Sequence, residues 1–147
     1  MTSQPPLYAS QFVGIPFADL GRTIDSCDCW GLTRLVIAAR AGIELPMYST
    51  ISESDYREVS DSISAAKASE DWVSIPHGEE KELDVVEMVS PARQSSRISF
   101  LPLHVGIVVC PWWLLHTEAA TGSRLSCYRD QRTAARIIGF WRHRLLS

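Results

Sequence analysis

One helical segment near the start of the chain, followed by several short strand-like runs, constrains the fold more than any other sequence feature. Residues 29–41 carry apolar side chains at helical spacing. The second half instead has short apolar runs separated by turn-forming residues, which is typical of strands. This order predicts an α+β domain with an antiparallel sheet. The predicted strands are Leu83–Val89, Val105–Cys110, Trp113–Thr117, Leu125–Tyr128 and Ile137–Trp141, with breaks at Pro91, Pro111 and Gly122.

The first predicted helix has a defined start and a defined end. Asp28 is a favourable N-cap residue, so the helix is expected to begin at or near Cys29, and Gly42 supplies a C-terminal stop. The apolar face of this helix is predicted to consist of Leu32, Leu35, Val36 and Ala39.

Charged residues are segregated along the sequence. Residues 53–87 contain eleven acidic and three basic side chains, whereas residues 124–144 contain six arginines and one aspartate. A second, more exposed helix is predicted in the acidic segment, from a capping-box-like start at Ser52 to about Ser69. Two solvent-exposed faces of the protein, one acidic and one basic, would explain this pattern. The alternative is a docking surface for a charged partner.

The size and composition are those of one globular domain. The chain has 147 residues, 46% of them hydrophobic, which is enough for a core without disulfides or a structural metal. We therefore predict a single domain over residues 1–147. The apolar content excludes intrinsic disorder, and the net charge of -3 argues against a general nucleic-acid binder.

Targeting signals are missing from the sequence. Its first residues, 1–6, contain no basic region followed by an apolar run, and no apolar stretch approaches the roughly 20 residues that cross a bilayer. We expect a protein made in the cytoplasm, with no signal peptide and no membrane insertion. In that compartment its four cysteines are expected to stay reduced, so a functional cysteine would be a nucleophile or a metal ligand.

Cys29 is the strongest candidate for a reactive group. It follows the N-cap residue Asp28, so its sulfur is expected at the N-terminus of the first helix. The helix dipole and the amide hydrogens at this end lower the pKa of a cysteine, and a protonated imidazole nearby lowers it further. A buried structural cysteine is the alternative.

Two histidines are predicted to lie close together. With Pro111-Trp112 as the turn, His104 and His116 stand opposite one another on paired strands. His104 is then placed to deprotonate Cys29 while His116 fixes its tautomer, as nucleophilic acyl transfer requires. Two histidines at a sheet edge with no catalytic role are one alternative. A zinc site made of both histidines, Cys29 and Cys27 is another, although a C-x-C pair is tighter than the usual spacing.

The order and spacing of these motifs resemble the NlpC-type cell-wall cysteine peptidases. Asp28-Cys29-Trp30-Gly31-Leu32 is followed, 75 residues after the cysteine, by His104-Val105-Gly106-Ile107, and His116 comes 12 residues later. More narrowly, the chain resembles the tail-tip peptidase components of long-tailed phages and gene transfer agents. Further segments that carry this likeness are Val13-Gly14-Ile15-Pro16-Phe17, Gly21-Arg22, Leu45-Pro46 and Ile138-Gly139-Phe140-Trp141-Arg142.

The resemblance implies a papain-like fold, in which the nucleophile helix packs against an antiparallel sheet. It implies hydrolysis of an amide bond in the stem peptides of peptidoglycan. Cys29 would be the nucleophile, His104 the general base and then acid, and His116 the orienting residue. A thioacyl enzyme would form and water would release it, with backbone N–H groups near the helix start stabilising the oxyanion. No metal or other cofactor is implied.

Several positions near the nucleophile depart from the family pattern. Many relatives have a tyrosine where this chain has Phe17, which lacks the hydroxyl. The residue after the nucleophile is often a serine and is Trp30 here, so that serine's recognition of a substrate amino group does not carry over. The run Ile24-Asp25-Ser26-Cys27 replaces a glycine pair. Substrate contacts are expected from Phe17, Asp28, Trp30 and Trp112, with the two tryptophans as candidates for a glycan groove.

The remaining cysteines, histidines and tryptophans have ordinary structural interpretations. Cys110 and Cys127 are expected in the core, and His77 and His143 at the surface. The tryptophans are expected mainly in core and interface packing, and they are Trp30, Trp72, Trp112, Trp113 and Trp141.

Our leading hypothesis is a peptidoglycan peptidase carried in the tail tip of a phage-like particle, where it opens the cell wall for DNA delivery. The expected partners are the peptidoglycan stem peptide and other tail-tip or hub proteins, with no nucleic acid and no membrane. A peptidase fold of this size leaves no room for a wall-binding module, so targeting would come from the particle. The alternative is a structural tail-tip protein that keeps the fold, with hydrolysis absent or incidental.

Overall fold

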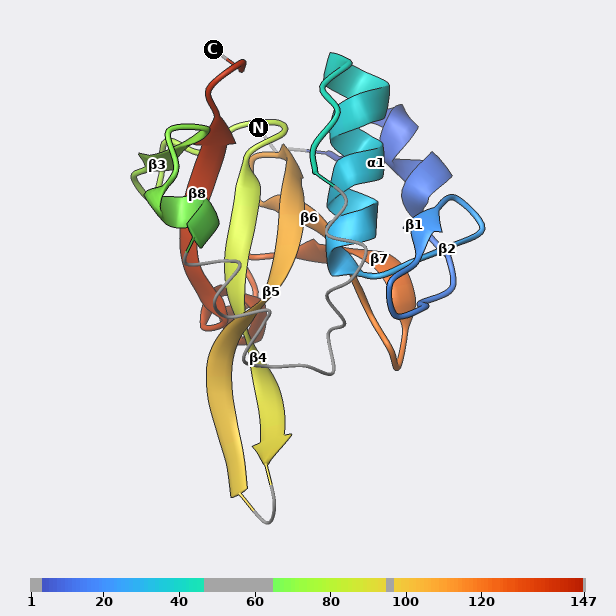
Figure 1. Cartoon of the computed structure of the whole chain (residues 1–147), viewed down its shortest axis with the longest axis vertical. Coiled ribbons are helices and arrows are strands. Elements are labelled where there is room, and N and C mark those ends of the chain that lie inside the picture. The colour runs from blue at the N-terminus through green and yellow to red at the C-terminus, as the bar shows by residue number, and fades with distance from the viewer. Residues whose placement is uncertain (1–3, 47–64, 95–96, 147) are drawn as a thin grey trace.

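A computed structural model describes residues 4–46, 65–94 and 97–146 of the chain (Figure 1). The helical elements are η1 (Leu7–Phe12), α1 (Cys29–Ala41) and α3 (Gln131–Ala134), and residues 65–68 are also helical. The strands are β1 (Arg22–Thr23), β2 (Ser26–Cys27), β3 (Trp72–Ile75), β4 (Val85–Gln94), β5 (Arg97–Cys110), β6 (Trp113–Glu118), β7 (Gly122–Cys127) and β8 (Ile137–His143).

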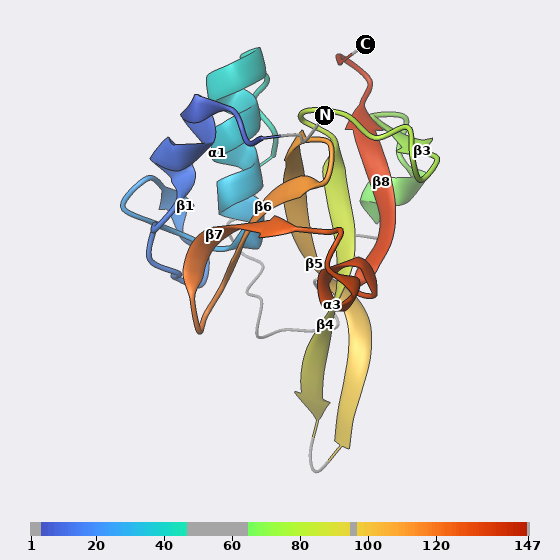
Figure 2. The same ribbon diagram turned by 180° about the vertical axis from the view of Figure 1, so that it is seen from behind.

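Strands β3 to β8 form one antiparallel sheet in the order β3-β8-β4-β5-β6-β7. Strands β1 and β2 form a separate small sheet just before α1. Seen from both sides, α1, η1 and the small sheet lie at the end of the molecule that carries β6 and β7, away from β3 and β8 (Figures 1 and 2). The predicted α+β architecture with an antiparallel sheet is confirmed.

The β4–β5 hairpin extends beyond the rest of the molecule (Figure 1). The predicted break at Pro91 is wrong, because β4 continues through this residue and pairs it with Phe100 of β5. On its other edge, β4 pairs with β8 from Val85 to Met88 within the described residues. Pro91 therefore lies past that contact, where a proline without an N–H donor is tolerated.

The other predicted strands are present with shifted ends, and three strands, β1, β2 and β3, were not predicted. β5 and β6 meet at the predicted Pro111-Trp112 turn, whereas β7 begins at Gly122, earlier than expected. β3 has no clear alternation of buried and exposed residues, which explains why its sequence gives no strand signal. The second predicted helix, 52–69, lies largely outside the described residues.

Both predicted ends of α1 are confirmed. The Asp28 side chain caps the helix by accepting the N–H of Gly31, and Gly42 ends it in the left-handed conformation, with φ 69°. The predicted apolar face is partly wrong, because Ile37 is buried whereas Ala39 is exposed. Residues 38–40 are all exposed, so Ala39 lies on the solvent side of the helix, whereas Ala41 packs against the core.

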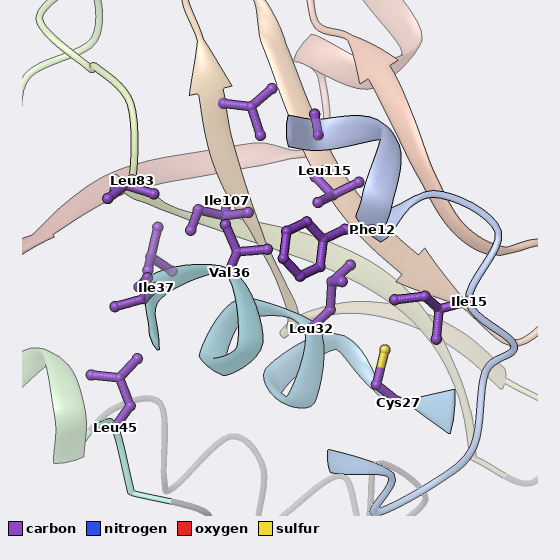
Figure 3. Close-up of a cluster of buried hydrophobic side chains, with 13 residues drawn as sticks. Phe12, Ile15, Cys27, Leu32, Val36, Ile37, Leu45, Leu83, Ile107 and Leu115 are labelled. Carbon is purple, nitrogen blue, oxygen red and sulfur yellow. The ribbon is translucent and has the colours of Figure 1, made fainter. Parts of the chain in front are cut away.

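Helix α1 packs on one face of the sheet through the first hydrophobic cluster (Figure 3). Leu32 and Val36 from the helix lie in this cluster with Ile107 of β5 and Leu115 of β6. Burying a side chain of this size contributes about 1.5 to 3 kcal/mol. This packing holds α1 against β5 and β6, the two strands that carry the histidines.

The alternate positions of the same strands build a second hydrophobic cluster. Because side chains on a strand alternate between faces, Val108 and Leu114 point away from Ile107 and Leu115. The cluster comprises Val86, Met88, Val108, Leu114, Tyr128 and Phe140. The sheet is therefore covered by apolar side chains on both faces.

The acidic and basic segments of the sequence contact each other within the molecule. Arg142 pairs with Asp84 at 2.7 Å, and this aspartate is fully buried. Arg144 pairs with Asp71 at 2.9 Å. Part of the charge that suggested a docking surface is therefore neutralised inside the chain.

Three of the structural expectations for single residues change. His143 is buried rather than exposed, because its ring packs edge-on against Trp72 with the centroids 5.1 Å apart. Cys110 and Cys127 lie at strand ends and are only partly buried. His77 is exposed, as predicted.

Among the described residues, no helix combines the length and the apolar character needed to cross a membrane.

Candidate active site

Cys29 is held in place by the residue before it. It is the first residue of α1 and is 5% exposed. The Asp28 carboxylate accepts the Gly31 N–H at 2.8 Å through Oδ1. Its Oδ2 accepts the Leu20 N–H at 3.1 Å and pairs with Arg22 at 2.6 Å. Asp28, a predicted substrate contact, is 2% exposed and uses both oxygens within the chain, so its role in this structure is to position the helix start.

Gly31 allows the helix start to pack closely on the preceding loop. A Cβ at this position would collide with the carbonyl oxygen of Gly21. The same carbonyl accepts the Asp28 N–H at 3.2 Å. The Gly21-Arg22 and Asp28-Cys29-Trp30-Gly31 motifs therefore belong to one local structure, which sets the position of the Cys29 sulfur.

The two predicted histidines are in direct contact. Nε2 of His104 lies 2.9 Å from Nδ1 of His116, and both rings are almost fully buried. Their predicted register is wrong by two residues, because β5 and β6 pair Ile107 with Leu115. His116 thus stands opposite Gly106, and a Cβ on Gly106 would lie 3.1 Å from the His116 Cβ. The glycine leaves space for His104 to reach His116 diagonally.

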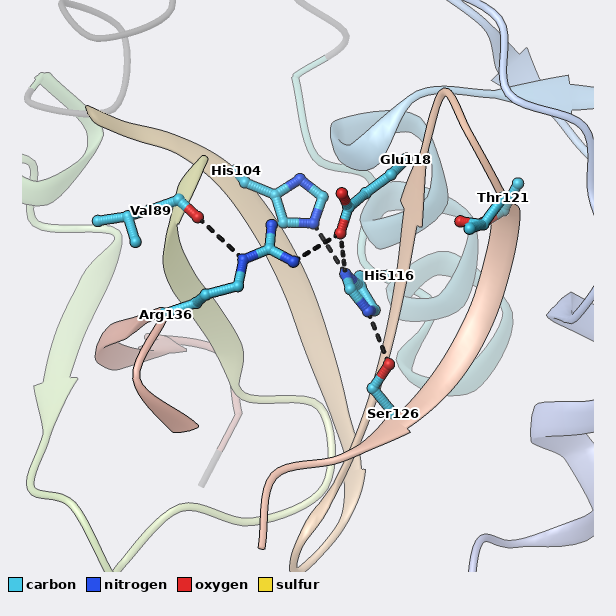
Figure 4. Close-up of polar contacts among 8 residues, drawn as sticks. Val89, His104, His116, Glu118, Thr121, Ser126 and Arg136 are labelled. Atoms are coloured by element: carbon cyan, nitrogen blue, oxygen red, sulfur yellow. Dashed lines mark hydrogen bonds and ion pairs between the residues drawn. The ribbon is translucent and has the colours of Figure 1, made fainter. Parts of the chain in front are cut away.

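Three polar residues that the sequence did not point to surround the pair (Figure 4). Nε2 of His116 lies 2.9 Å from Oγ of Ser126 on β7, and its Nδ1 lies 3.5 Å from Oε1 of Glu118. Arg136 holds the same Glu118 oxygen at 2.7 Å. Glu118 lies near His116 because residues two apart on β6 share a face. Ser126 reaches His116 because β6 and β7 pair directly, in a register that the sequence alone does not give.

Burial lowers the pKa of both histidines well below the usual value. For His104, desolvation is the main cause, and the neighbouring His116 adds to it. For His116, desolvation is again the main cause and Glu118 partly offsets it. Burial alone would raise the pKa of Glu118, but the hydrogen bond from Arg136 and the charge of Arg136 lower it. Both imidazoles are therefore neutral at neutral pH in this arrangement.

A neutral pair leaves one ring nitrogen of His104 for another group. If His104 donates its Nε2–H to His116, then His116 donates its own Nε2–H to the Ser126 hydroxyl. Nδ1 of His104 then carries a lone pair that can accept a proton. Within the described part of the chain, the hydrogen bond of the His104 ring is made through Nε2, so Nδ1 is the atom that would face a thiol.

The structure thus brings together two of the three predicted catalytic residues. The group of potential ligand atoms within 4.8 Å of one another consists of His104, His116 and Glu118, and Cys29 lies outside it. Cys27 is also outside it and is fully buried in the first hydrophobic cluster. The alternative zinc site with two cysteines and two histidines is therefore wrong.

The predicted aromatic substrate contacts are spread over the molecule. Phe17 is half-buried and forms a bridge to Cys27, two residues before the nucleophile candidate. Trp30 donates its indole N–H to the Pro46 carbonyl at 2.7 Å. Trp112 lies in the β5–β6 turn at φ 77°, with Arg129 stacked 4.6 Å from its ring centroid. Phe17 and Trp30 are near the helix start, and a substrate role for all three stays a prediction.

No family model and no curated protein matches the sequence. Among solved structures, the chain is similar to an NLP/P60 family protein from Staphylococcus aureus, described as similar to a lipoprotein. The TM-score is 0.60 at 21% identity over 92% of this chain and 38% of the other.

Two further structures give the same picture. The NlpC/p60 domain of the peptidoglycan hydrolase SagA has a TM-score of 0.53 at 13% identity, covering 90% of both chains. An NlpC/P60 family protein from Bacillus cereus has a TM-score of 0.59 at 15% identity, over 95% of this chain and 41% of the other. The chain has the NlpC/P60 fold. It spans less than half of the S. aureus and B. cereus structures. At these sequence identities, the similarity to the three structures shows a shared fold.

Proposed function

We propose that this chain is a cysteine peptidase that hydrolyses amide bonds in the stem peptides of peptidoglycan. The observation that carries the proposal is the hydrogen bond between His104 Nε2 and His116 Nδ1, which leaves Nδ1 of His104 for a thiol. The capped helix that begins at Cys29 supports it, because a helix N-terminus favours thiolate. The substrate class is supported by the sequence motifs and by the likeness to the NlpC/p60 domain of a peptidoglycan hydrolase.

In the proposed reaction, His104 Nδ1 takes the proton of the Cys29 thiol, and the thiolate attacks the carbonyl carbon of the amide. The imidazolium then protonates the leaving amine as the C–N bond breaks, which gives a thioacyl enzyme. His104 next deprotonates a water molecule that releases the carboxylate product and the free thiol. Since the Gly31 N–H is already donated to Asp28, the oxyanion would be stabilised by N–H groups nearer the helix start.

His116 and Ser126 would hold the base in its reactive tautomer. When His104 becomes an imidazolium, its Nε2–H still donates to His116 Nδ1, so no hydrogen bond is lost during proton transfer. The nearby Glu118 carboxylate, 3.5 Å from His116, would stabilise the positive charge. This combination gives His116 the role of orienting residue.

We also propose that the peptidase is carried in the tail tip of a phage-like particle and acts there with other tail-tip or hub proteins. The support is the narrower sequence resemblance, carried by segments such as Gly21-Arg22, Leu45-Pro46 and residues 138–142. Peptide mass spectrometry of purified particles would test this location. The chain should copurify with tail proteins, and its absence from intact particles would contradict the proposal.

The peptidase proposal is tested by incubating the wild type with purified peptidoglycan and analysing the soluble products by mass spectrometry. We expect released stem peptides that are absent with Cys29→Ala and with His104→Gln. Cys110→Ala is the matched control, because it removes a partly buried thiol away from the proposed site, and it should keep the wild-type products. Circular dichroism would establish that each variant is folded.

If folded wild type releases no more product than Cys29→Ala on walls from several bacteria, the peptidase proposal is wrong. A chain that still assembles into particles would then fit the alternative, a structural tail-tip component that keeps the fold without hydrolysis.

A further inference from the structure

Three donor atoms of the histidine site are spaced as ligands of one small cation. Nδ1 of His116 lies 2.9 Å from Nε2 of His104 and 3.5 Å from Oε1 of Glu118. In a tetrahedral zinc site with bonds near 2.0 to 2.1 Å, two ligand atoms are about 3.3 Å apart. These two separations lie on either side of that value, and the ligand atoms of all three groups lie within 4.8 Å of one another, so side-chain movements would seat one ion among them.

The contacts around these groups are those that support metal ligands. A histidine that binds a metal through one nitrogen usually donates the N–H of the other to a fixed acceptor, and a ligating carboxylate is usually hydrogen-bonded. If His116 binds through Nδ1, its Nε2–H donates to Ser126 Oγ at 2.9 Å. Arg136 donates to Oε1 of Glu118 at 2.7 Å, which holds the carboxylate beside the two rings.

An ion can reach the group from the side of Glu118. The side chains of Glu118 and Arg136 are 30% and 25% exposed, whereas His116 is 1% exposed. The positive charge of Arg136 opposes a cation and limits its affinity. The two neutral imidazoles and the carboxylate favour Zn²⁺ over hard cations such as Mg²⁺, which prefer oxygen ligands.

We propose that His104 Nε2, His116 Nδ1 and the Glu118 carboxylate bind one Zn²⁺ ion, with water at the fourth position. The consequence for catalysis rests on the proposed peptidase function. A neutral His104 that binds zinc through Nε2 carries its proton on Nδ1, so it has no lone pair for the Cys29 thiol. Bound zinc would therefore switch hydrolysis off, and removing it with a chelator would restore the base.

The binding claim is tested without any substrate. Protein freed of metal is titrated with ZnCl₂ in competition with a zinc-binding dye, and Co²⁺ is used as a spectroscopic probe. We expect one equivalent of zinc to bind to wild type and equally to Cys29→Ala. The Co²⁺ complex should have tetrahedral d–d bands without a sulfur-to-cobalt charge-transfer band. His77→Gln, which removes an exposed histidine outside the group, is the matched control.

The ligand assignments are tested with Glu118→Gln and His116→Gln. Both should bind zinc at least about 100-fold more weakly, and Ser126→Ala about 10-fold more weakly, because it removes only an outer contact. Glu118 is partly exposed, so its variant should fold even if His116→Gln does not. The proposal is overturned if wild type binds no zinc, if Cys29→Ala loses the ion, or if Glu118→Gln binds like wild type.

Zinc binding and hydrolysis give separate answers. If the chain binds zinc but never cleaves peptidoglycan, the zinc site is supported and the peptidase proposal is wrong. If the chain hydrolyses peptidoglycan, but a chelator does not increase the rate and added ZnCl₂ does not lower it, the zinc switch is wrong. The peptidase proposal then still stands.

Discussion

Arg22 and Asp28 form an ion pair at 2.6 Å, and their side chains are only 6% and 2% exposed. The same carboxylate caps α1, so a single side chain closes the loop before the helix and fixes the residue that follows it, Cys29. A buried pair of this kind is costly to break, because the charge that stays buried then lacks the attraction of its partner.

Asp28→Ala should therefore be strongly destabilising. We expect a loss of about 3 to 5 kcal/mol in the free energy of unfolding, because Arg22 is left buried and α1 loses its cap. Asp130→Ala is the matched control, since Asp130 caps the short exposed helix α3 by accepting the Arg132 N–H. Its cost should be about 1 kcal/mol. Urea unfolding measures both values, and equal losses would show that the Arg22 pair adds nothing to the cap.

Gly106→Ala should disturb the histidine pair. The new Cβ would lie 3.0 Å from the Leu115 carbonyl oxygen and 3.1 Å from the His116 Cβ, so β6 or His116 must shift. We expect a loss of about 1 to 3 kcal/mol in stability and a change in the NMR signals of both imidazoles. Gly139→Ala, whose Cβ would meet no described atom closer than 3.8 Å, is the control and should keep those signals. Unchanged imidazole signals in Gly106→Ala would contradict the diagonal contact.

Much of the fold can be predicted from the sequence, because the local sequence signals specify the same elements that the tertiary packing stabilises. Asp28 and Gly42 are strong capping residues, and both end α1 where predicted. The predicted break at Pro91 is wrong, because a proline interrupts a strand only where the neighbouring strand would accept a hydrogen bond from its N–H. The pairing of β8 with β4 ends before Pro91. His143 was misplaced because its burial comes from Trp72, a residue of an unpredicted strand.

The candidate site was only partly predictable for the same reason. The contact between His104 and His116 follows from a hairpin with a short turn, and it is present despite the wrong register. Ser126 and Arg136 could not be assigned, because they reach the site through the pairing of β6 with β7 and through the chain that leads into β8. Glu118 shares a face of β6 with His116, but the sequence does not show that this face carries the site. Their types and spacing along the sequence carry no motif.

Stability should fall as the pH drops below about 6.5, the usual histidine pKa in an unfolded chain. Burial lowers the pKa of His104, His116 and His143 in the folded state, so the unfolded chain takes up protons first. Each of them contributes up to about 1.4 kcal/mol per pH unit. Urea unfolding between pH 7 and pH 5, a window that keeps Glu118 ionised, would measure the slope.

The His143→Phe variant measures how much of this pH dependence of stability comes from His143. The substitution keeps an aromatic ring against Trp72 but removes the titrating group, so the slope of stability against pH should become smaller. A variant with the full wild-type slope would show that folding does not shift the pKa of His143.

Cys29 and Cys27 should differ sharply in reactivity, although only Asp28 separates them. Burial and the negative charge of Asp28 raise the pKa of Cys27 to about 11, whereas Cys29 stands at a helix N-terminus that favours thiolate. With iodoacetamide at a pH two units below the usual thiol pKa of about 8.5, we expect label on Cys29 alone. Both cysteines lie on the tryptic peptide 23–34, so fragment ions assign the site. His104→Gln should slow the labelling, because the neutral amide cannot accept the thiol proton; an unchanged rate would show that His104 does not activate Cys29.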